Sequence, residues 1–355
     1  MPEILLYGAT GYTAGLIIEL ASSYGINIVL AGRSAEKLKS LAERHALPYR
    51  VADLQDAAAL DAMLQDIPVV LHCAGPFIRT ALLMQQGCLR TGTHYLDITG
   101  EIPVFEQGMA LHQAAIEKNI MLMSGVGFDV VPTDCMALYL KQRLPDATHL
   151  QLAIHNQDGA VSRGTALTVV EGLGEGSQVR ENGKLKTVPI THKAMSVPFK
   201  ADKSLLCMTI PWGDLATAYH TTGIPNIETF MATPPMAIRA AKLANYFTWL
   251  LRSRWFRQFA QRRINRSLTG PDEQVRGKAR SMVWGKAWNS RGTSVQARLE
   301  GPEAYTLTAL TALLITRNVL DGHWEPGYQT PAAVYGPELI LKVPNTTRED
   351  IPVNS

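Results

Sequence analysis

Ile4 to Ala14, I-L-L-Y-G-A-T-G-Y-T-A, is the stretch that decides the fold of the first part of this chain. Ile4 to Tyr7 is a short apolar run, which predicts a buried strand. Gly8, Gly11 and Ala14 follow at G-x-x-G-x-x-A spacing, and an apolar-periodic segment then predicts a helix. In such a unit the first glycine permits a tight turn, and the second lets backbone approach a pyrophosphate. The N-terminus of the helix favours the phosphate charge.

This context predicts a dinucleotide site rather than a bare structural turn, although any strand-to-helix turn can use glycine. We expect the phosphate-binding set to lie in the turn and at the start of the helix: Gly8, Thr10, Gly11, Tyr12 and Thr13.

The second predicted strand, Ile26 to Ala31, indicates which nucleotide is bound. It ends in Gly32-Arg33-Ser34, and no acid lies between Tyr24 and Ala35. An Asp or Glu at this position binds the ribose hydroxyls of NAD, whereas an Arg suits the 2′-phosphate of NADP. Arg33 and Ser34 therefore predict NADP(H), the alternative for Arg33 being a solvated loop charge.

Asp53 follows a third predicted strand and has two interpretations. It would either contact the adenine edge of the nucleotide or cap the helix predicted from Ala57 to Leu64.

Strand and helix patterns alternate over the first 130 residues, which predicts a doubly wound parallel sheet, a Rossmann domain at 1–130. The further strands are expected at 49–52, 69–73, 94–101 and 120–123, the third of these carrying charge at its end, and the further helices at 35–45, 81–90 and 104–118.

Polar and turn-forming residues at the carboxyl ends of these strands are candidates for the chemistry. The turn Ala74, Gly75, Pro76 either covers the ribose and nicotinamide or only breaks the strand. Tyr95, Asp97 and Asp129 are candidate proton donors or orienting groups, alongside Glu101. The alternative for the two aspartates is that they bind backbone N–H groups in turns. No Tyr has a Lys four residues later, which disfavours the short-chain dehydrogenase mechanism.

Composition excludes several other classes of protein. The chain has 355 residues, of which 46% are hydrophobic, and a net charge of +3, too slight to imply nucleic acid by itself. The four cysteines form no C-x-x-C, so neither a metal site nor a redox pair is expected. No run of eighteen apolar residues and no signal-peptide pattern is present, and a cytoplasmic setting is the default expectation.

Beyond the first domain the pattern loosens, and we expect an α+β domain with a mixed or antiparallel sheet at 131–304. Ser162 to Thr165 opens a predicted helix and is either an anion-binding or substrate-binding edge or a plain cap. Residues 305–355 are expected to form a helix and a tail that pack back on the Rossmann domain.

Residues 236–266 depart from this plan, with eight basic residues, six aromatic residues and no acid. Basic charge with aromatics on a helix is typical of a segment that lies on anionic lipid. The alternative is a helical lid or homodimer arm whose arginines extend to solvent. Nucleic-acid binding is not expected, because no recognised module accompanies the charge.

Several motifs resemble those of one family when they are taken together. G-A-T-G-Y-T-A-G, L-A-G-R-S, C-A-G-P-F, H-Y-L-D-I-T-G-E and G-F-D-V-V-P-T-D occur in that order between Gly8 and Asp134, and the likeness continues to Gly336. They resemble the saccharopine dehydrogenase-like oxidoreductases and trans-acting enoyl reductases. The resemblance implies an NADP-dependent oxidoreductase with a Rossmann domain and an inserted α/β domain.

The function expected from these patterns is reduction of a C=C, C=O or C=N bond of a small, hydrophobic or acyl metabolite. The alternative is a non-catalytic NADP(H)-sensing protein or a lipid-associated scaffold, because no proton donor stands out among the candidates.

Overall fold

The chain forms two compact units in a computed structural model that describes residues 3–160, 162, 164, 166, 167, 170, 174–251, 253–267 and 270–352. The first unit comprises residues 1–131 and 305–334, and the second comprises residues 132–304 and 335–355. The second unit is therefore an insertion in the chain of the first, with a C-terminal addition. No helix in the described ranges is long and apolar enough to cross a membrane.

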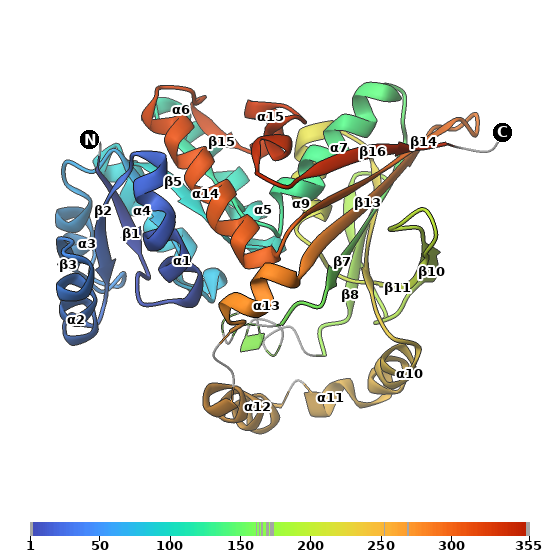
Figure 1. Cartoon of the computed structure of the whole chain (residues 1–355), viewed down its shortest axis with the longest axis horizontal. Coiled ribbons are helices and arrows are strands. Elements are labelled where there is room, and N and C mark those ends of the chain that lie inside the picture. Colours follow the sequence, from blue (N-terminus) through green and yellow to red (C-terminus); the bar gives the residue numbers. More distant parts are fainter. Residues whose placement is uncertain are drawn as a thin grey trace. The chain divides into compact units, whose positions relative to one another are not determined.

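The first unit is built on a parallel sheet with the strand order β15-β6-β5-β4-β1-β2-β3 (Figure 1). Its strands are short and, except for the edge strand β3, buried at their centres, as expected when helices cover both faces of a parallel sheet. Their bounds are β1 (Glu3–Tyr7), β2 (Asn27–Gly32), β3 (Tyr49–Val51), β4 (Val69–His72), β5 (His94–Asp97), β6 (Met121–Met123) and β15 (Gly327–Gln329). The predicted Rossmann fold is confirmed, and β15 adds a strand from the far end of the chain.

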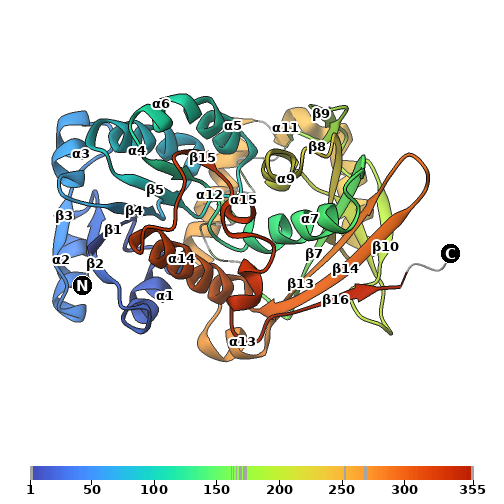
Figure 2. The ribbon, with the colours of Figure 1, turned by 90° about the horizontal axis from the view of Figure 1, so that it is seen from above.

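Helices flank this sheet on both sides (Figure 2). On one side, α3 (Ala57–Leu64), α4 (Phe77–Thr91), α5 (Ile102–Ala110) and α6 (His112–Glu117) pack on alternate strand residues such as Leu5, Val70 and Tyr95. On the other lie α1 (Tyr12–Leu20) and α14 (Ala304–Leu320), while α2 (Ala35–His45) follows β2. This alternation of buried faces is the period-2 pattern of strands.

The second unit holds a mixed sheet with the strand order β10-β11-β12-β7-β13-β14-β16, and β8 and β9 attach as a hairpin to β12. Among the strands that the structure describes in this sheet, β7 and β12 alone pair in parallel. The bounds are β7 (His149–Gln157), β8 (Ser177–Glu181), β9 (Lys184–Val188), β10 (Ala194–Val197), β11 (Leu205–Thr209), β12 (Asn226–Ala232), β13 (Arg280–Trp288), β14 (Ser294–Pro302) and β16 (Thr347–Ile351). The predicted mixed sheet is therefore confirmed.

Helix α7 (Val131–Arg143) packs on one face of this sheet, against Gly285 of β13. A Cβ atom there would lie 2.7 Å from side-chain atoms of both Leu140 and Met136, so glycine permits the close approach of helix to sheet. The described part of this unit also includes the helices α9 (Asp214–Thr222), α10 (Pro235–Ala244), α11 (Thr248–Leu251), α12 (Arg254–Ser267) and α13 (Glu273–Lys278).

The expectation for residues 305–355 needs correction. Residues up to Val334 belong to the first unit, but 335–355 belong to the second. Strand β16 pairs antiparallel with β14, and the Tyr139 hydroxyl of α7 donates a hydrogen bond to Asp350 at 2.9 Å. The tail was mispredicted because T-R-E-D-I is a polar edge strand, which lacks the apolar alternation of a buried one. The predicted helix start at Ser162 to Thr165 lies partly outside the described residues.

Candidate functional site

The predicted nucleotide site lies where the strand order of the first sheet reverses, between β1 and β4. Open α/β sheets bind ligands outside the carboxyl ends of the strands at such a point. Gly8, directly after β1, has φ +84°, and a Cβ atom on it would lie 2.7 Å from the Ala74 nitrogen and 2.8 Å from the Cys73 carbonyl carbon. Only glycine therefore allows the turn after β1 to lie against the turn after β4.

The start of α1 provides the phosphate-binding edge. Its N-cap residue is Gly11, which has no side chain with which to cap the helix, and its first turn contains no acid. Thr10 and Gly11 are exposed and Tyr12 and Thr13 are partly exposed, whereas Ala14 is fully buried. An accessible, acid-free helix N-terminus favours a bound anion through its N–H groups and its dipole.

The end of β2 carries the residues predicted to meet the 2′-phosphate. Arg33 is exposed, and Ser34 is the N-cap residue of α2. Burial raises the pKa of the nearby Tyr7 phenol to about 12, with Asp53 raising it further and Arg33 opposing the change. Both charges therefore lie near one phenol. The negative charge of Asp53 thus lies near the positive charge of Arg33, and the Arg33 side chain is exposed to solvent.

Asp53 does not cap α3. The N-cap residue is Asp56, whose carboxylate accepts a hydrogen bond from the Ala59 N–H at 3.0 Å. The Asp53 carboxylate instead accepts from the Gln55 N–H at 3.0 Å, in a local turn. Asp53 is exposed, so its side chain is accessible to a ligand.

The turn Ala74, Gly75, Pro76 is held by a side chain from a distant part of the sequence. Helix α4 begins at Phe77, four residues before the predicted start, because the Glu101 carboxylate accepts hydrogen bonds from the N–H groups of Phe77 at 2.8 Å and Ile78 at 2.9 Å. The Thr80 hydroxyl also donates to the Ala74 carbonyl at 2.7 Å. Glu101 thus fixes the beginning of α4 and, with it, the turn after β4.

Asp97 is fully buried and its carboxylate is surrounded by donors. It accepts hydrogen bonds from the Tyr95 hydroxyl at 2.6 Å and from the N–H groups of Thr99 and Gly125, each at 2.9 Å. Burial raises the pKa of Asp97, and these hydrogen bonds oppose the rise. Tyr95 is also fully buried, and burial beside Asp97 raises its pKa well above the ordinary value. Asp97 thus joins the segment after β5 to the segment after β6. These contacts favour the alternative role of Asp97, in which it binds backbone N–H groups in turns.

Asp129 is partly accessible to solvent, whereas Asp97 is fully buried. Desolvation of the carboxyl, together with the negative charge of Glu101, raises the pKa of Asp129 to about 7. Gly100 lies directly against it, and a Cβ atom there would lie 2.6 Å from the Asp129 Oδ2 atom. The first unit thus places a carboxylic acid that is half protonated near neutral pH beside the residue that caps α4.

The sequence predicts Asp129 and Glu101 as candidates, but it does not predict Gly100, which lies against Asp129. The signal was present in H-Y-L-D-I-T-G-E, where glycine separates two polar residues at the end of a strand. It could not be read as a contact with Asp129, because the two residues lie on different loops.

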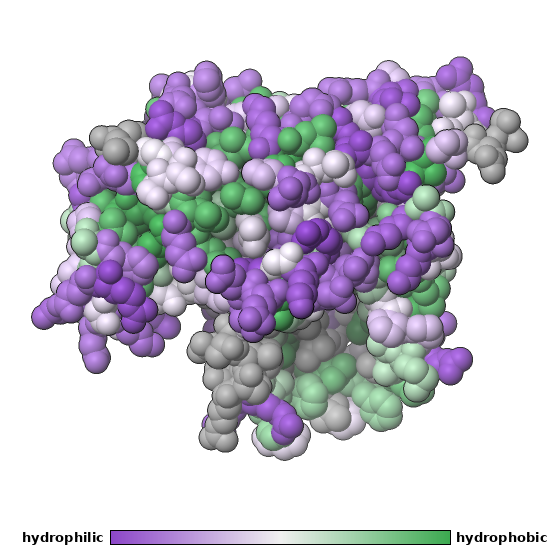
Figure 3. Space-filling model, viewed as in Figure 1, coloured by the Kyte–Doolittle hydropathy of each residue, from purple (hydrophilic) through white to green (hydrophobic). Residues whose placement is uncertain are grey.

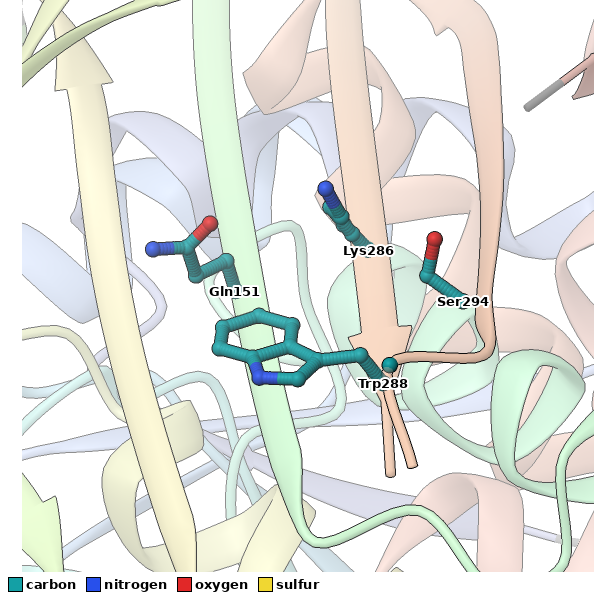
Figure 4. Close-up of a pocket in the computed structure, with 5 residues that line it drawn as sticks. Gln151, Lys286, Trp288 and Ser294 are labelled. Carbon is teal, nitrogen blue, oxygen red and sulfur yellow. The ribbon is translucent and has the colours of Figure 1, made fainter. Parts of the chain in front are cut away.

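A pocket elsewhere in the described structure is lined by none of the site residues predicted from the sequence. It lies in the second unit and has a volume of about 310 Å³. Its lining includes Gln151 and Lys286, which project from neighbouring strands beside Trp288 and Ser294 (Figure 4). No group of three His, Cys, Asp or Glu side chains able to hold a metal ion occurs in the described part of the chain.

The fold and the glycine turn after β1 are those of a nucleotide-binding domain. Residues 4–123 match the family described as the saccharopine dehydrogenase NADP binding domain. The cofactor of this domain family is NADP(H), and the open glycine cradle and the cation after β2 fit that cofactor.

Individual relatives carry the same two names that the motifs suggested. The chain is 35% identical over 150 residues to a trans-acting enoyl reductase of Mycobacterium leprae, an alignment covering 40% of this chain and 36% of that protein. It is 28% identical over 217 residues to the human saccharopine dehydrogenase-like oxidoreductase, covering 53% of this chain and 50% of that protein. The chain therefore spans half or less of the length of these relatives.

A solved structure supports the fold of the whole chain. Apo saccharopine dehydrogenase (L-Glu forming) of Saccharomyces cerevisiae matches with a TM-score of 0.68 at 15% identity, covering 99% of this chain and 100% of that one. At this identity the likeness shows a shared fold alone.

Proposed function

We propose that this chain is an NADPH-dependent reductase whose proton donor is Asp129. The observation that carries the proposal is the place of the Asp129 carboxyl, which lies in the loop after β6 and directly against Gly100. Desolvation and the Glu101 charge raise its pKa to about 7, and a carboxyl with a raised pKa can hold a proton and release it to a substrate. It belongs to the same unit as the nucleotide-binding turn, and it follows a strand of the same sheet.

Each part of the nucleotide has a residue set suited to it. Gly8, Gly11 and the start of α1, with Thr10, Tyr12 and Thr13, would hold the pyrophosphate.

Arg33 and Ser34 would bind the 2′-phosphate, with Asp53 at the adenine edge. The turn Ala74 to Pro76, fixed by Glu101, would lie against the ribose and nicotinamide.

NADPH, when bound, supplies a hydride to one atom of the reducible double bond. Asp129 gives its proton to the other atom, so the substrate gains one hydride and one proton. The carboxylate left on Asp129 is then unfavourable, because it is desolvated and lies near the Glu101 charge. Since the residue is partly accessible, water can return the proton. Tyr95 and Asp97 act in this scheme as positioning residues for the loops after β5 and β6.

A C=C, C=O or C=N bond next to an electron-withdrawing group is the substrate class that this chemistry suits. Among these we favour a hydrophobic or acyl compound, since the curated relatives include trans-acting enoyl reductases.

Two measurements on purified protein test this proposal. The first is the dissociation constants of NADPH and NADH for wild type and Arg33→Ala. We expect NADPH binding to weaken by about tenfold or more in the variant, because a charge-assisted contact to phosphate is lost, while NADH binding stays unchanged. Equal binding of the two cofactors by the wild type would refute the assignment of Arg33.

The second is NADPH oxidation across a panel of enoyl thioesters, ketones and imines, with wild type and Asp129→Asn. We expect the variant to lose about 100-fold or more in turnover, because Asn cannot donate an acidic proton. NADPH binding with no turnover by the wild type on any compound class would instead favour a protein that senses NADP(H).

A further inference from the structure

The segment of residues 235–267, here called the arm, carries most of the exposed large apolar side chains in the part of the chain that the structure describes. It consists of α10, a 3₁₀ turn at Asn245–Phe247, α11 and α12. Seven of the twelve exposed large hydrophobic residues in the described chain lie on it: Met236, Leu243, Tyr246, Phe247, Trp249, Trp255 and Phe259. Scattered exposed apolar residues are ordinary, but such a concentration marks an interaction surface.

One side of the arm is fixed to the second unit, which leaves the other side outward. Ile238 of α10 is only 5% exposed. The Asn245 side chain makes two hydrogen bonds to the backbone of Ile190, accepting from its N–H at 3.1 Å and donating to its carbonyl at 2.9 Å. In contrast, Tyr246 is 80% exposed and Trp249 is 71% exposed. The aromatic side chains thus project from an anchored base.

Helix α12 combines aromatic rings and cations. Trp255 and Phe259, four residues apart and hence on one face, stack with ring centroids 6.3 Å apart, and both are exposed. Arg262 and Arg263 are exposed on the turns that follow. Figure 3 shows apolar and weakly polar side chains gathered at the lower edge, over the α10 and α11 part of the arm.

Charge limits what can cover this surface. Residues 236–266 contain eight basic residues and no acid. In a symmetric dimer a second copy would present the same patch, so like charges would face one another in the absence of any acid in the segment. A nucleic acid would satisfy the cations, but Met236 and Leu243 would gain nothing from a phosphate backbone. A lipid interface offers anionic headgroups for the cations and hydrocarbon for the apolar side chains.

We propose that the arm binds the surface of an anionic lipid bilayer. The aromatic rings of Trp249, Trp255 and Phe259 enter the headgroup region, and Arg262 and Arg263 bind lipid phosphates. The binding is peripheral and uses residues of the second unit alone, so it is independent of the predicted NADP(H) site.

The test is sedimentation of the full chain with sucrose-loaded vesicles, made either of phosphatidylcholine alone or with 30 mol% phosphatidylglycerol. Two variants target the arm, Arg262→Glu with Arg263→Glu and Trp255→Ala with Phe259→Ala. The matched control is Lys118→Glu with Lys342→Glu, which changes the net charge equally at exposed positions outside the arm. Circular dichroism and NADPH binding check that each variant is folded.

We expect binding to the anionic vesicles, weak binding to the neutral ones, and at least tenfold weaker binding of the arginine variant, since each basic residue near such a surface contributes about fivefold. The aromatic variant should also bind at least tenfold more weakly, and the lysine control should retain wild-type affinity. Failure of wild type to bind anionic vesicles would overturn the proposal, as would equal loss in the lysine control. A dimer abolished by the aromatic variant, or preference for single-stranded DNA over vesicles, would assign the arm to a different partner.

Discussion

Replacing Asp129 by Asn should change how the stability of the protein depends on pH. Burial and the Glu101 charge raise the pKa of Asp129 from 3.8 to about 7. The protonated carboxyl therefore contributes stability that is fully present below pH about 4 and is lost as the pH rises to about 7. At 1.36 kcal/mol per pH unit the loss amounts to about 4 kcal/mol, an upper limit because the residue is partly exposed.

Urea unfolding at pH values from 4.5 to 8.5 measures this effect. The free energy of unfolding of the wild type, relative to Asp129→Asn, should fall by up to about 3 kcal/mol over that range and level off above pH 7. Other titrating groups are common to both proteins and cancel in the difference. A difference that changes by less than about 0.5 kcal/mol across the range would show that the carboxyl is not held protonated. The choice of Asp129 as proton donor would then lose its basis.

Four further substitutions probe the neighbouring contacts. Gly8→Ala should lower the unfolding free energy by more than about 1 kcal/mol and weaken NADPH binding, because the added Cβ meets the backbone after β4 and the φ is +84°. Asp97→Ala should destabilise the protein by about 3 kcal/mol or more in urea unfolding, since it leaves several buried donors without an acceptor, whereas Tyr95→Phe, which removes one donor, should cost about 1 to 2 kcal/mol. Glu101→Gln should lower the pKa of Asp129, measured by NMR titration of the carboxyl, because it removes the neighbouring charge.

The Gly8→Ala experiment has a matched control in α1, the helix that follows the Gly8 turn. Gly15 of α1 has no atom within 4 Å of a Cβ placed on it, so Gly15→Ala should be neutral or slightly stabilising in the same assay. Comparable damage from both alanines would contradict the steric account of the turn. An unchanged pKa of Asp129 in the Glu101 variant would show that desolvation alone raises it. Equal costs of the Asp97 and Tyr95 variants would mean that the backbone hydrogen bonds of Asp97 add nothing.

Local patterns predicted the parallel sheet because each buried strand is a short apolar run ended by glycine or a polar residue, and such runs need no tertiary information. The features that were missed depend on distant parts of the chain. The start of α4 was placed four residues late because its cap, Glu101, lies 24 residues from Phe77. Strand β15 is three residues long and pairs with β6 across about 200 residues of sequence, a separation that no periodicity reveals.

The candidate site follows the same division. Asp129 was identified by its position at a strand end, but its raised pKa arises from burial and from a carboxylate on another loop. The sequence left Asp97 with two roles, and only the structure, which places several donors around its carboxylate, favours an anchoring role.

The return of residues 305–334 to the first sheet bears on how the chain folds during synthesis. When the ribosome has made residue 131, the edge of β6 still lacks β15, and the pocket in the core that Tyr328 fills is still empty. At about 5 to 20 residues per second, roughly 10 to 40 s pass before that strand emerges. Residues 132–304 of the second unit are made during this interval. They can fold while the first unit is still incomplete. Nascent chains stalled before residue 327 should therefore be markedly more sensitive to protease in the first unit than chains stalled well beyond residue 334.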